Sequence, residues 1–176
     1  MRWGLIMSPL IVYHSLTGNT RLLAEKLKAA YPGASLFTAQ QVQGQISRLQ
    51  QAPIVFVGFW CDRGMMPESI QTLVPHLKDK KLGVFATMGG DPQSDRAKQW
   101  FARQCDTLVG EDRGNLLQAH FLCQGKIDPA LIERMKKLPG YKETPESVAR
   151  RELAATHPNE SDLSELVRVF REGFGG

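Results

Sequence analysis

Short apolar runs alternate along this chain with segments whose apolar residues recur at the spacing of a helix. The runs predict β-strands, and the amphipathic segments predict α-helices. The predicted strands are 10–13, 35–38, 54–59, 81–87 and 115–121, and the predicted helices are 21–30, 67–77, 95–108, 129–138 and 162–170. Strands that alternate with helices form parallel sheets covered on both faces, so the pattern predicts an α/β, doubly wound fold.

The two ends of the chain are less regular than its middle. We expect the 176 residues to form a single domain, with residues 1–8 as a dispensable N-terminal extension. Turn-forming residues bound the segment 139–160, which we expect to be an irregular excursion over the surface. The predicted helix 162–170 follows this segment, and Ser161 or Asn159 is expected to cap it.

The first predicted strand runs directly into the turn Ser15-Leu16-Thr17-Gly18-Asn19-Thr20, and a helix follows. Its hydroxyl groups can donate hydrogen bonds, its glycine allows close backbone approach, and the amides that open a helix attract anions. No lysine follows the turn, unlike in the phosphate loop of nucleoside triphosphatases, so we expect neutral donors to bind a phosphate here. The alternative is that Asn19 or Thr20 only caps the helix.

At every defining position this turn matches the phosphate loop Ser/Thr-x-Thr-Gly-x-Thr of flavodoxins, and the chain therefore resembles that family. The resemblance implies a flavodoxin-like five-stranded parallel sheet with strand order 2-1-3-4-5 and helices on both faces. It also implies flavin mononucleotide (FMN) as cofactor, with the phosphate at residues 15–20 and the ring beyond the ends of neighbouring strands.

Two more loops follow central strands at the edge where open α/β sheets bind ligands. They are Phe59-Trp60-Cys61-Asp62-Arg63-Gly64-Met65-Met66-Pro67 and Thr87-Met88-Gly89-Gly90-Asp91-Pro92. We expect Trp60 to stack on the flavin ring and the glycines to let backbone amides face its polar edge. The alternative for Trp60 is an aromatic side chain that packs on a neighbouring helix. The predicted cofactor-binding residues are Ser15, Leu16, Thr17, Gly18, Asn19, Thr20, Phe59, Trp60, Cys61, Gly64, Thr87, Met88, Gly89 and Gly90, and no catalytic residue is assigned.

Three side chains near these loops have a second possible role. Arg63 is a candidate cation for tuning the redox potential of the flavin, and its alternative is a solvated arginine paired with Asp62. Cys61 and Cys123 come just after predicted strands and could approach the flavin. A lone cysteine in such a place is usually a small buried apolar group, so we assign neither thiol a catalytic role.

The segments Phe59–Gly64 and Phe121-Leu122-Cys123-Gln124-Gly125-Lys126 resemble those of a subgroup of flavodoxin family proteins, and the similarity covers residues 10–137. It implies FMN binding and electron transfer, and it identifies no partner. Three functions stay open. The favoured one is an electron carrier that serves a redox partner protein; the others are a flavin-dependent NAD(P)H:quinone-type oxidoreductase and a flavin-free flavodoxin-fold binding protein.

The charge of the chain departs from that of familiar flavodoxins, which are typically strongly acidic. Lysine and arginine total 22 against 18 aspartate and glutamate, a formal net charge of +4. This excess favours acidic partners or anionic substrates. The basic residues are dispersed without interleaved aromatic residues, so no nucleic-acid partner is expected.

The cysteines, the histidines and the hydropathy of the chain indicate its compartment and whether it binds a metal or enters a membrane. Three cysteines without close pairing fit a reducing compartment, and no His or Cys pair has the spacing of metal ligands, so we expect no metal. No apolar stretch approaches the roughly 20 residues that span a bilayer. We therefore expect a cytoplasmic protein without membrane insertion, as a monomer or weak homodimer.

Overall fold

Five parallel strands form one sheet in the order β2-β1-β3-β4-β5, which confirms the predicted order 2-1-3-4-5. The computed structural model describes residues 8–175, so the predicted extension at residues 1–8 lies almost wholly outside them. The strands are β1 (Leu10–Tyr13), β2 (Ser35–Thr38), β3 (Ile54–Trp60), β4 (Lys81–Met88) and β5 (Leu116–Gln124). The short β2 lies at the edge and the apolar β3 in the centre, as their lengths and composition predict.

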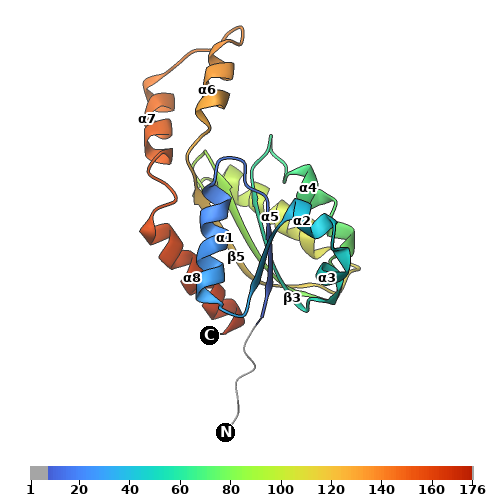
Figure 1. Cartoon of the computed structure of the whole chain (residues 1–176). Helices are drawn as coiled ribbons and strands as arrows, with labels where there is room; N and C mark the ends of the chain where they lie inside the picture. Colours follow the sequence, from blue (N-terminus) through green and yellow to red (C-terminus); the bar gives the residue numbers. More distant parts are fainter. Residues whose placement is uncertain (1–7, 176) are drawn as a thin grey trace.

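Helices cover both faces of the sheet (Figure 1). On one face α1 (Asn19–Ala30) and α8 (Glu160–Phe174) bury their apolar residues against alternate residues of the strands. The other face carries α2 (Ala39–Gln43), α3 (Ile46–Gln51), α4 (Glu68–Gln71) and α5 (Asp95–Val109). The predicted α/β architecture with two helical layers is therefore confirmed.

One predicted helix is broken. The segment 67–77 forms only the single turn α4 and the short 3-10 helix η1 (Val74–His76), because Pro75 has no N–H to continue an α-helix and its ring clashes with the preceding turn. By contrast, Asn159 caps α8 as expected, since its side chain accepts a hydrogen bond from the amide of Asp162 over 3.0 Å. The sequence pattern did not predict α2 or α3.

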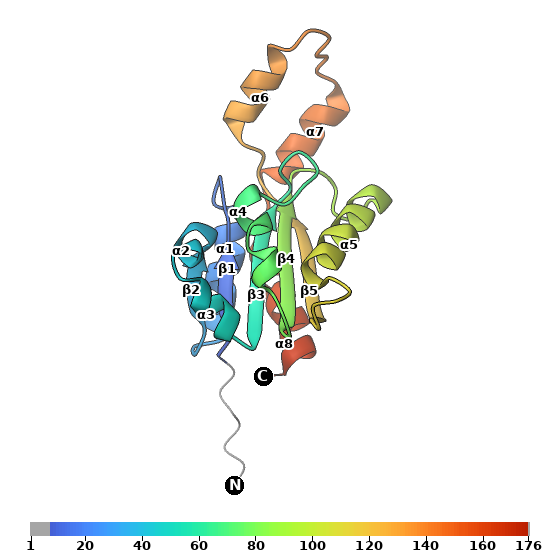
Figure 2. The same cartoon turned by 90° about the vertical axis from the view of Figure 1, so that its right-hand side faces the viewer.

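The segment 139–160 was predicted to be irregular, and that prediction is wrong. It contains α7 (Pro145–Ala154), which begins with a capping box between Thr144 and Ser147. Together with α6 (Pro129–Lys136), α7 forms a helical hairpin that stands beyond the carboxyl ends of the strands (Figures 1 and 2). We call residues 129–154 the arm.

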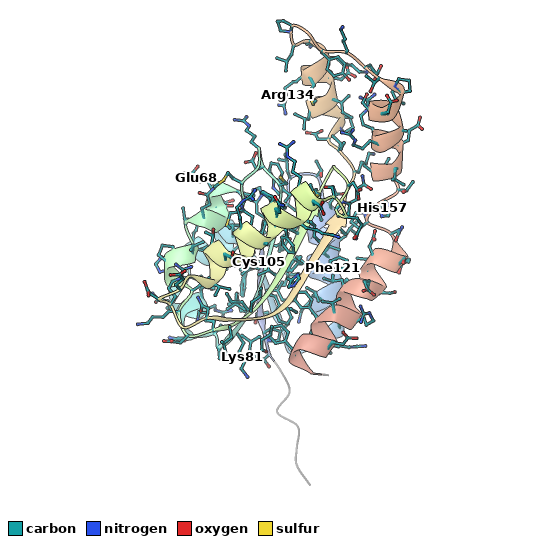
Figure 3. All side chains as sticks on the ribbon, turned by 180° about the vertical axis from the view of Figure 1, so that it is seen from behind. Glu68, Lys81, Cys105, Phe121, Arg134 and His157 are labelled. Carbon is teal, nitrogen blue, oxygen red and sulfur yellow. The ribbon has the colours of Figure 1, made fainter. Side chains whose placement is uncertain are left out.

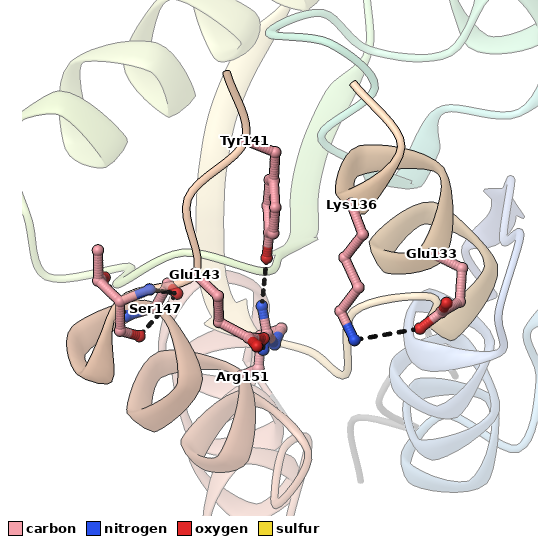
Figure 4. Close-up of polar contacts among 7 residues, drawn as sticks. Glu133, Lys136, Tyr141, Glu143, Ser147 and Arg151 are labelled. Carbon is pink, nitrogen blue, oxygen red and sulfur yellow. Dashed lines mark hydrogen bonds and ion pairs between the residues drawn. The ribbon is translucent and has the colours of Figure 1, made fainter. Parts of the chain in front are cut away.

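The arm packs little against the rest of the molecule. Ala154 is its only buried residue. Two sets of polar contacts lie within the arm (Figure 4): Lys136 donates to Glu133 inside α6, and Arg151 of α7 binds both Glu143 and the hydroxyl of Tyr141 in the connection. Across residues 8–175, no helix combines the length and the apolar character needed to cross a membrane.

Candidate functional site

A cleft of about 470 Å³ lies where β1, β3, β4 and β5 end, beneath the arm. The parallel register brings these strand ends to one level, pairing Trp60 with Thr87 and Thr87 with Cys123. Eleven of the fourteen predicted cofactor-binding residues line it: Ser15, Leu16, Thr17, Asn19, Thr20, Trp60, Cys61, Thr87, Met88, Gly89 and Gly90. Other hollows beside α5 and between β5 and α8 contain none of these residues.

The loop 15–20 leaves the start of α1 open to a ligand. Gly18 is the N-cap residue with a positive φ of 98°, a conformation that favours glycine, and its amide donates to Ser15 Oγ over 3.1 Å. No side chain caps the helix, and its first turn carries no acidic residue. The alternative that Asn19 or Thr20 serves only as a helix cap is therefore excluded, and the amides of the first turn can bind an anion.

Thr20 joins the loop to the sheet. Its hydroxyl lies 3.0 Å from that of Thr87, and both residues are buried. The contact uses one of the two hydroxyl protons, so the other can be donated to a ligand in the cleft. Thr20 thus has a structural role that the sequence motif does not reveal.

Asn19 connects the loop to the end of β5. Its side-chain amide donates to the carbonyl oxygen of Lys126 over 2.9 Å and to Thr17 Oγ1 over 3.3 Å. A Cβ atom at Gly125 would lie 2.6 Å from the Asn19 amide nitrogen, so this approach requires glycine. The loop and the segment leading to the arm are therefore held together.

Trp60 lines the cleft, as the prediction that it faces a ligand requires. Its indole N–H donates to His14 Nδ1 over 2.8 Å, and the two rings are stacked with centroids 6.1 Å apart. Burial lowers the pKa of His14, an effect that the charge of Asp62 partly opposes. The neutral imidazole can accept this hydrogen bond and so fix the indole ring.

Three of the predicted cofactor-binding residues do not line the cleft. Gly18 contributes backbone geometry only, as described above. The side chain of Phe59 is fully buried on the α5 face, where it contacts Trp100 and Phe101. Gly64 sits in a turn with a φ of 78°, and its carbonyl oxygen accepts from the indole of Trp100 over 2.8 Å.

The thiols near the cleft are not suited to nucleophilic chemistry. Cys61 is half-buried in the cleft wall, and burial raises its pKa. Cys123 lies within β5, which extends three residues beyond the predicted strand, and its deeper burial raises its pKa further. Since the thiolate is the reactive form, neither group is activated at neutral pH.

The arm supplies cleft residues that sequence reasoning missed. Leu131, Arg134 and Met135 project from α6, and Arg150 comes from α7. The spacing i, i+3, i+4 of the α6 residues predicts a shared helix face, but no sequence signal shows where that face points. The further lining residues are Asp62, Arg63, Gly125, Lys126, Ile127 and Asp128.

The charged groups of the cleft are mostly cations. Arg63, Lys126, Arg134 and Arg150 line it, against Asp62 and Asp128. The structure contains no ion pair between Arg63 and Asp62 within residues 8–175, so the alternative of a paired loop arginine is not supported. Over the same residues, His, Cys, Asp and Glu side chains form no group of three that could hold a metal ion.

Comparisons with known proteins concern the family and the fold of the chain. A family model described as flavodoxin domain matches residues 10–171. Two proteins named flavodoxin-like domain-containing protein BilS are similar to the chain. The protein of Clostridium symbiosum (strain WAL-14163) is 30% identical over 175 residues, covering 88% of this chain and 89% of its own. That of Clostridioides difficile (strain CD3) is 25% identical over 173 residues, covering 90% and 92%.

A solved structure of a flavodoxin from the domain Archaea has the same fold. It superimposes with a TM-score of 0.53 at 18% identity, covering 93% of each chain. At this level of identity the match concerns the fold of the backbone.

Proposed function

The chain belongs to the flavodoxin domain family, and from this premise we propose that it binds FMN and transfers electrons to or from a redox partner protein. The observation that carries the proposal is the uncapped start of α1 beside hydroxyl groups, in a cleft that Trp60 also lines. A phosphate and a planar ring at opposite ends of one ligand match this arrangement.

The donor set fits the phosphate of FMN. Ser15 and Thr17 each accept one hydrogen bond within the loop, so each hydroxyl proton is free to be donated. The amides at the start of α1 add further donors and a partial positive charge. Together these groups would hold a doubly charged phosphate without a lysine in the loop.

The loops after β3 and β4 fit the ring. Trp60 offers an aromatic face that His14 holds in place, and residues 87–90 offer backbone amides. Gly89 is required, because a Cβ atom there would lie 2.6 Å from the side chain of Ile127. A bound flavin would supply the electron-accepting and electron-donating chemistry that these side chains lack.

We propose that the partner is a protein whose docking face carries acidic residues. The net charge of +4 and the cationic rim of the cleft support this choice over the basic partners of acidic carriers. In this proposal the chain acts in the cytoplasm as a monomer or weak homodimer.

One observation favours a second candidate, a flavin-dependent NAD(P)H:quinone-type oxidoreductase. The arm lies over a space beside the loops after β3 and β4, and such a space would admit a small substrate. The two candidates differ in one measurement: the oxidoreductase consumes NADH or NADPH with a quinone on its own, whereas the carrier needs a reductase partner.

The first experiment is to purify the protein with added FMN, desalt it and record its visible absorption spectrum. Retained flavin bands support the proposal, and steady-state NAD(P)H oxidation then separates carrier from oxidoreductase. If no flavin is retained and titration quenches no flavin fluorescence, the proposal is wrong and the flavin-free binding protein becomes the leading candidate.

A further inference from the structure

The inner face of the arm presents apolar surface that is left exposed by residues 8–175. Leu131 and Met135 line the cleft from one face of α6, and they are 41% and 43% exposed. Two neighbouring apolar side chains left open at the mouth of a cleft favour contact with the apolar part of a ligand. The arm thus provides a surface separate from the phosphate loop and the ring loops.

Two unpaired cations accompany this apolar surface. Arg134, which Figure 3 shows on α6, and Arg150 on α7 both line the cleft, and neither side chain has a hydrogen-bond or ion-pair partner within residues 8–175. Elsewhere on the arm, Glu133 pairs with Lys136 and Glu143 with Arg151 (Figure 4). The arginines of the inner face are therefore available to an anion from outside the chain.

The acidic residues of the cleft do not neutralise these arginines. Asp128 Oδ1 accepts from the amide of Ala130 at the start of α6, and Asp62 forms no ion pair within the described residues. Lys126 and Arg63 add two more cations to the same cleft. The lining side chains therefore make the electrostatic potential in the cleft positive.

Lys126 and His157, in the chain segments before and after the arm, are connected to the loop 15–20 by hydrogen bonds. The amide of Lys126 donates to the carbonyl oxygen of His157 over 3.1 Å, which joins the two chain segments that enter and leave the arm. The carbonyl oxygen of Lys126 accepts from Asn19, as described above. The two chain segments at the base of the arm are thus tied to each other and to the loop.

We propose that the inner face of the arm binds a second ligand beside the flavin, a small anion with an apolar body. Its carboxylate, sulfonate or phosphate group would contact Arg134 and Arg150, and its apolar body would lie on Leu131 and Met135. The arm residues line a concave cleft and not a flat surface, which favours a small molecule over a protein. This inference rests on the proposed function for the position of the flavin only.

The test is direct binding to the FMN-loaded protein at an ionic strength of about 0.15 M, at which exposed charges farther apart than about 8 Å are largely screened. Naphthalene-2-sulfonate is the anionic probe and 2-naphthylmethanol its uncharged counterpart, each titrated by calorimetry. The arm variant is R134Q/R150Q, and the control is R96Q/R103Q, which removes the same charge from exposed positions on α5 outside the cleft. Thermal unfolding of both variants checks that they fold.

We expect the arm variant to bind the sulfonate at least about tenfold more weakly, because charge-assisted hydrogen bonds are lost. The control should change by less than about twofold, since distant exposed charges are screened. The uncharged probe should bind both variants like the wild type, and L131S/M135S should weaken both probes.

Three results would overturn the inference. The wild type does not bind the sulfonate; or arm variant and control lose affinity equally; or the arm variant loses affinity for FMN but not for riboflavin, which assigns the arginines to the phosphate of the flavin. If the protein retains no FMN, the proposed function fails, and the same titrations on the flavin-free protein still decide whether the arm binds anions.

Discussion

The indole nitrogen of Trp60 lies 2.8 Å from Nδ1 of His14, and the indole donates the hydrogen bond. Nδ1 can accept only while it carries no proton, so the contact depends on a neutral imidazole. Burial lowers the pKa of His14 below its usual 6.5, which keeps the ring neutral at physiological pH. The orientation of the aromatic wall of the cleft is therefore linked to pH.

Acidification should weaken the folded state through His14. Because the folded pKa lies below the unfolded value of 6.5, the unfolded chain binds this proton more readily. The His14 contribution to the free energy of unfolding is complete above pH 6.5 and decreases as pH falls from 6.5 through the lowered pKa. Urea unfolding at several pH values measures it, and His14→Gln, which keeps an acceptor but does not titrate, should reduce the pH dependence. An unchanged dependence in this variant contradicts the prediction.

Thr17→Val and Thr20→Val should both weaken FMN binding, by about 1.5–3 kcal/mol, because each removes a donor to the charged phosphate. They should differ in stability. Thr17 is exposed, whereas Thr20→Val leaves the buried Thr87 hydroxyl without its partner, a cost of about 1–3 kcal/mol. Fluorescence titration with FMN and with riboflavin, together with chemical unfolding, measures both effects; equal losses of riboflavin and FMN affinity would count against a phosphate site.

Gly125→Ala and Asn19→Ala should interact. Asn19→Ala removes the hydrogen bond to the Lys126 carbonyl, at about 0.5–1.5 kcal/mol. Gly125→Ala places a methyl group 2.6 Å from the Asn19 amide nitrogen and should cost about 1–3 kcal/mol. In the double variant the obstructed side chain is absent, so the two losses should sum to more than the measured total. Additive losses would mean that the two residues do not contact each other in solution.

Phe59→Ala and Trp60→Ala should separate folding from ligand binding at adjacent positions. Phe59 is fully buried, so its truncation should cost about 3–5 kcal/mol of stability. Trp60 is half-buried in the cleft wall, and its loss should chiefly reduce FMN affinity, by about 0.5–1.5 kcal/mol for the lost aromatic contact. The opposite ranking in unfolding and titration experiments would place Trp60 in the core.

Arg63→Gln should make the midpoint potential of bound FMN more negative, because the exposed arginine favours the negative charge of the reduced flavin. An exposed charge contributes up to about 1 kcal/mol, equivalent to about 20 mV for a two-electron couple. Redox titration against a reference dye measures the shift. Arg103→Gln on α5 is the control, and an equal shift in both variants would indicate a general charge effect.

Local sequence signals predicted the sheet and the turn that leads into α1. The apolar run 10–13 and the turn after it are short-range patterns, and the structure places both as expected. Phe59 does not line the cleft because the direction of a side chain at a strand end depends on alternation between the faces of the sheet, which a loop motif does not encode. Gly64 lies in the turn after β3, where its carbonyl oxygen accepts from Trp100. Phe59 follows Val55 and Val57 onto the α5 face.

The arm shows a second limit of prediction from local sequence patterns. Its capping signals at Asp128 and Thr144 are present in the sequence, so α6 and α7 were within reach of local reasoning. Their position over the cleft depends on long-range contacts such as that between Lys126 and His157, which no local pattern specifies. Arg134 and Arg150 could therefore be recognised as cleft residues only in three dimensions.

The packing of α8 has a consequence for how the protein is made. Phe170 is fully buried against Phe56 and the backbone of Gly83, where a methyl group would lie 2.5 Å from its ring. All five strands leave the ribosome before Phe170 does, so during synthesis the part of this face that α8 covers, beside α1, stays open to water and to other chains. The nascent chain must therefore be protected from aggregation until the residues of α8 emerge, and synthesis that stalls in the arm would leave that part of the face exposed.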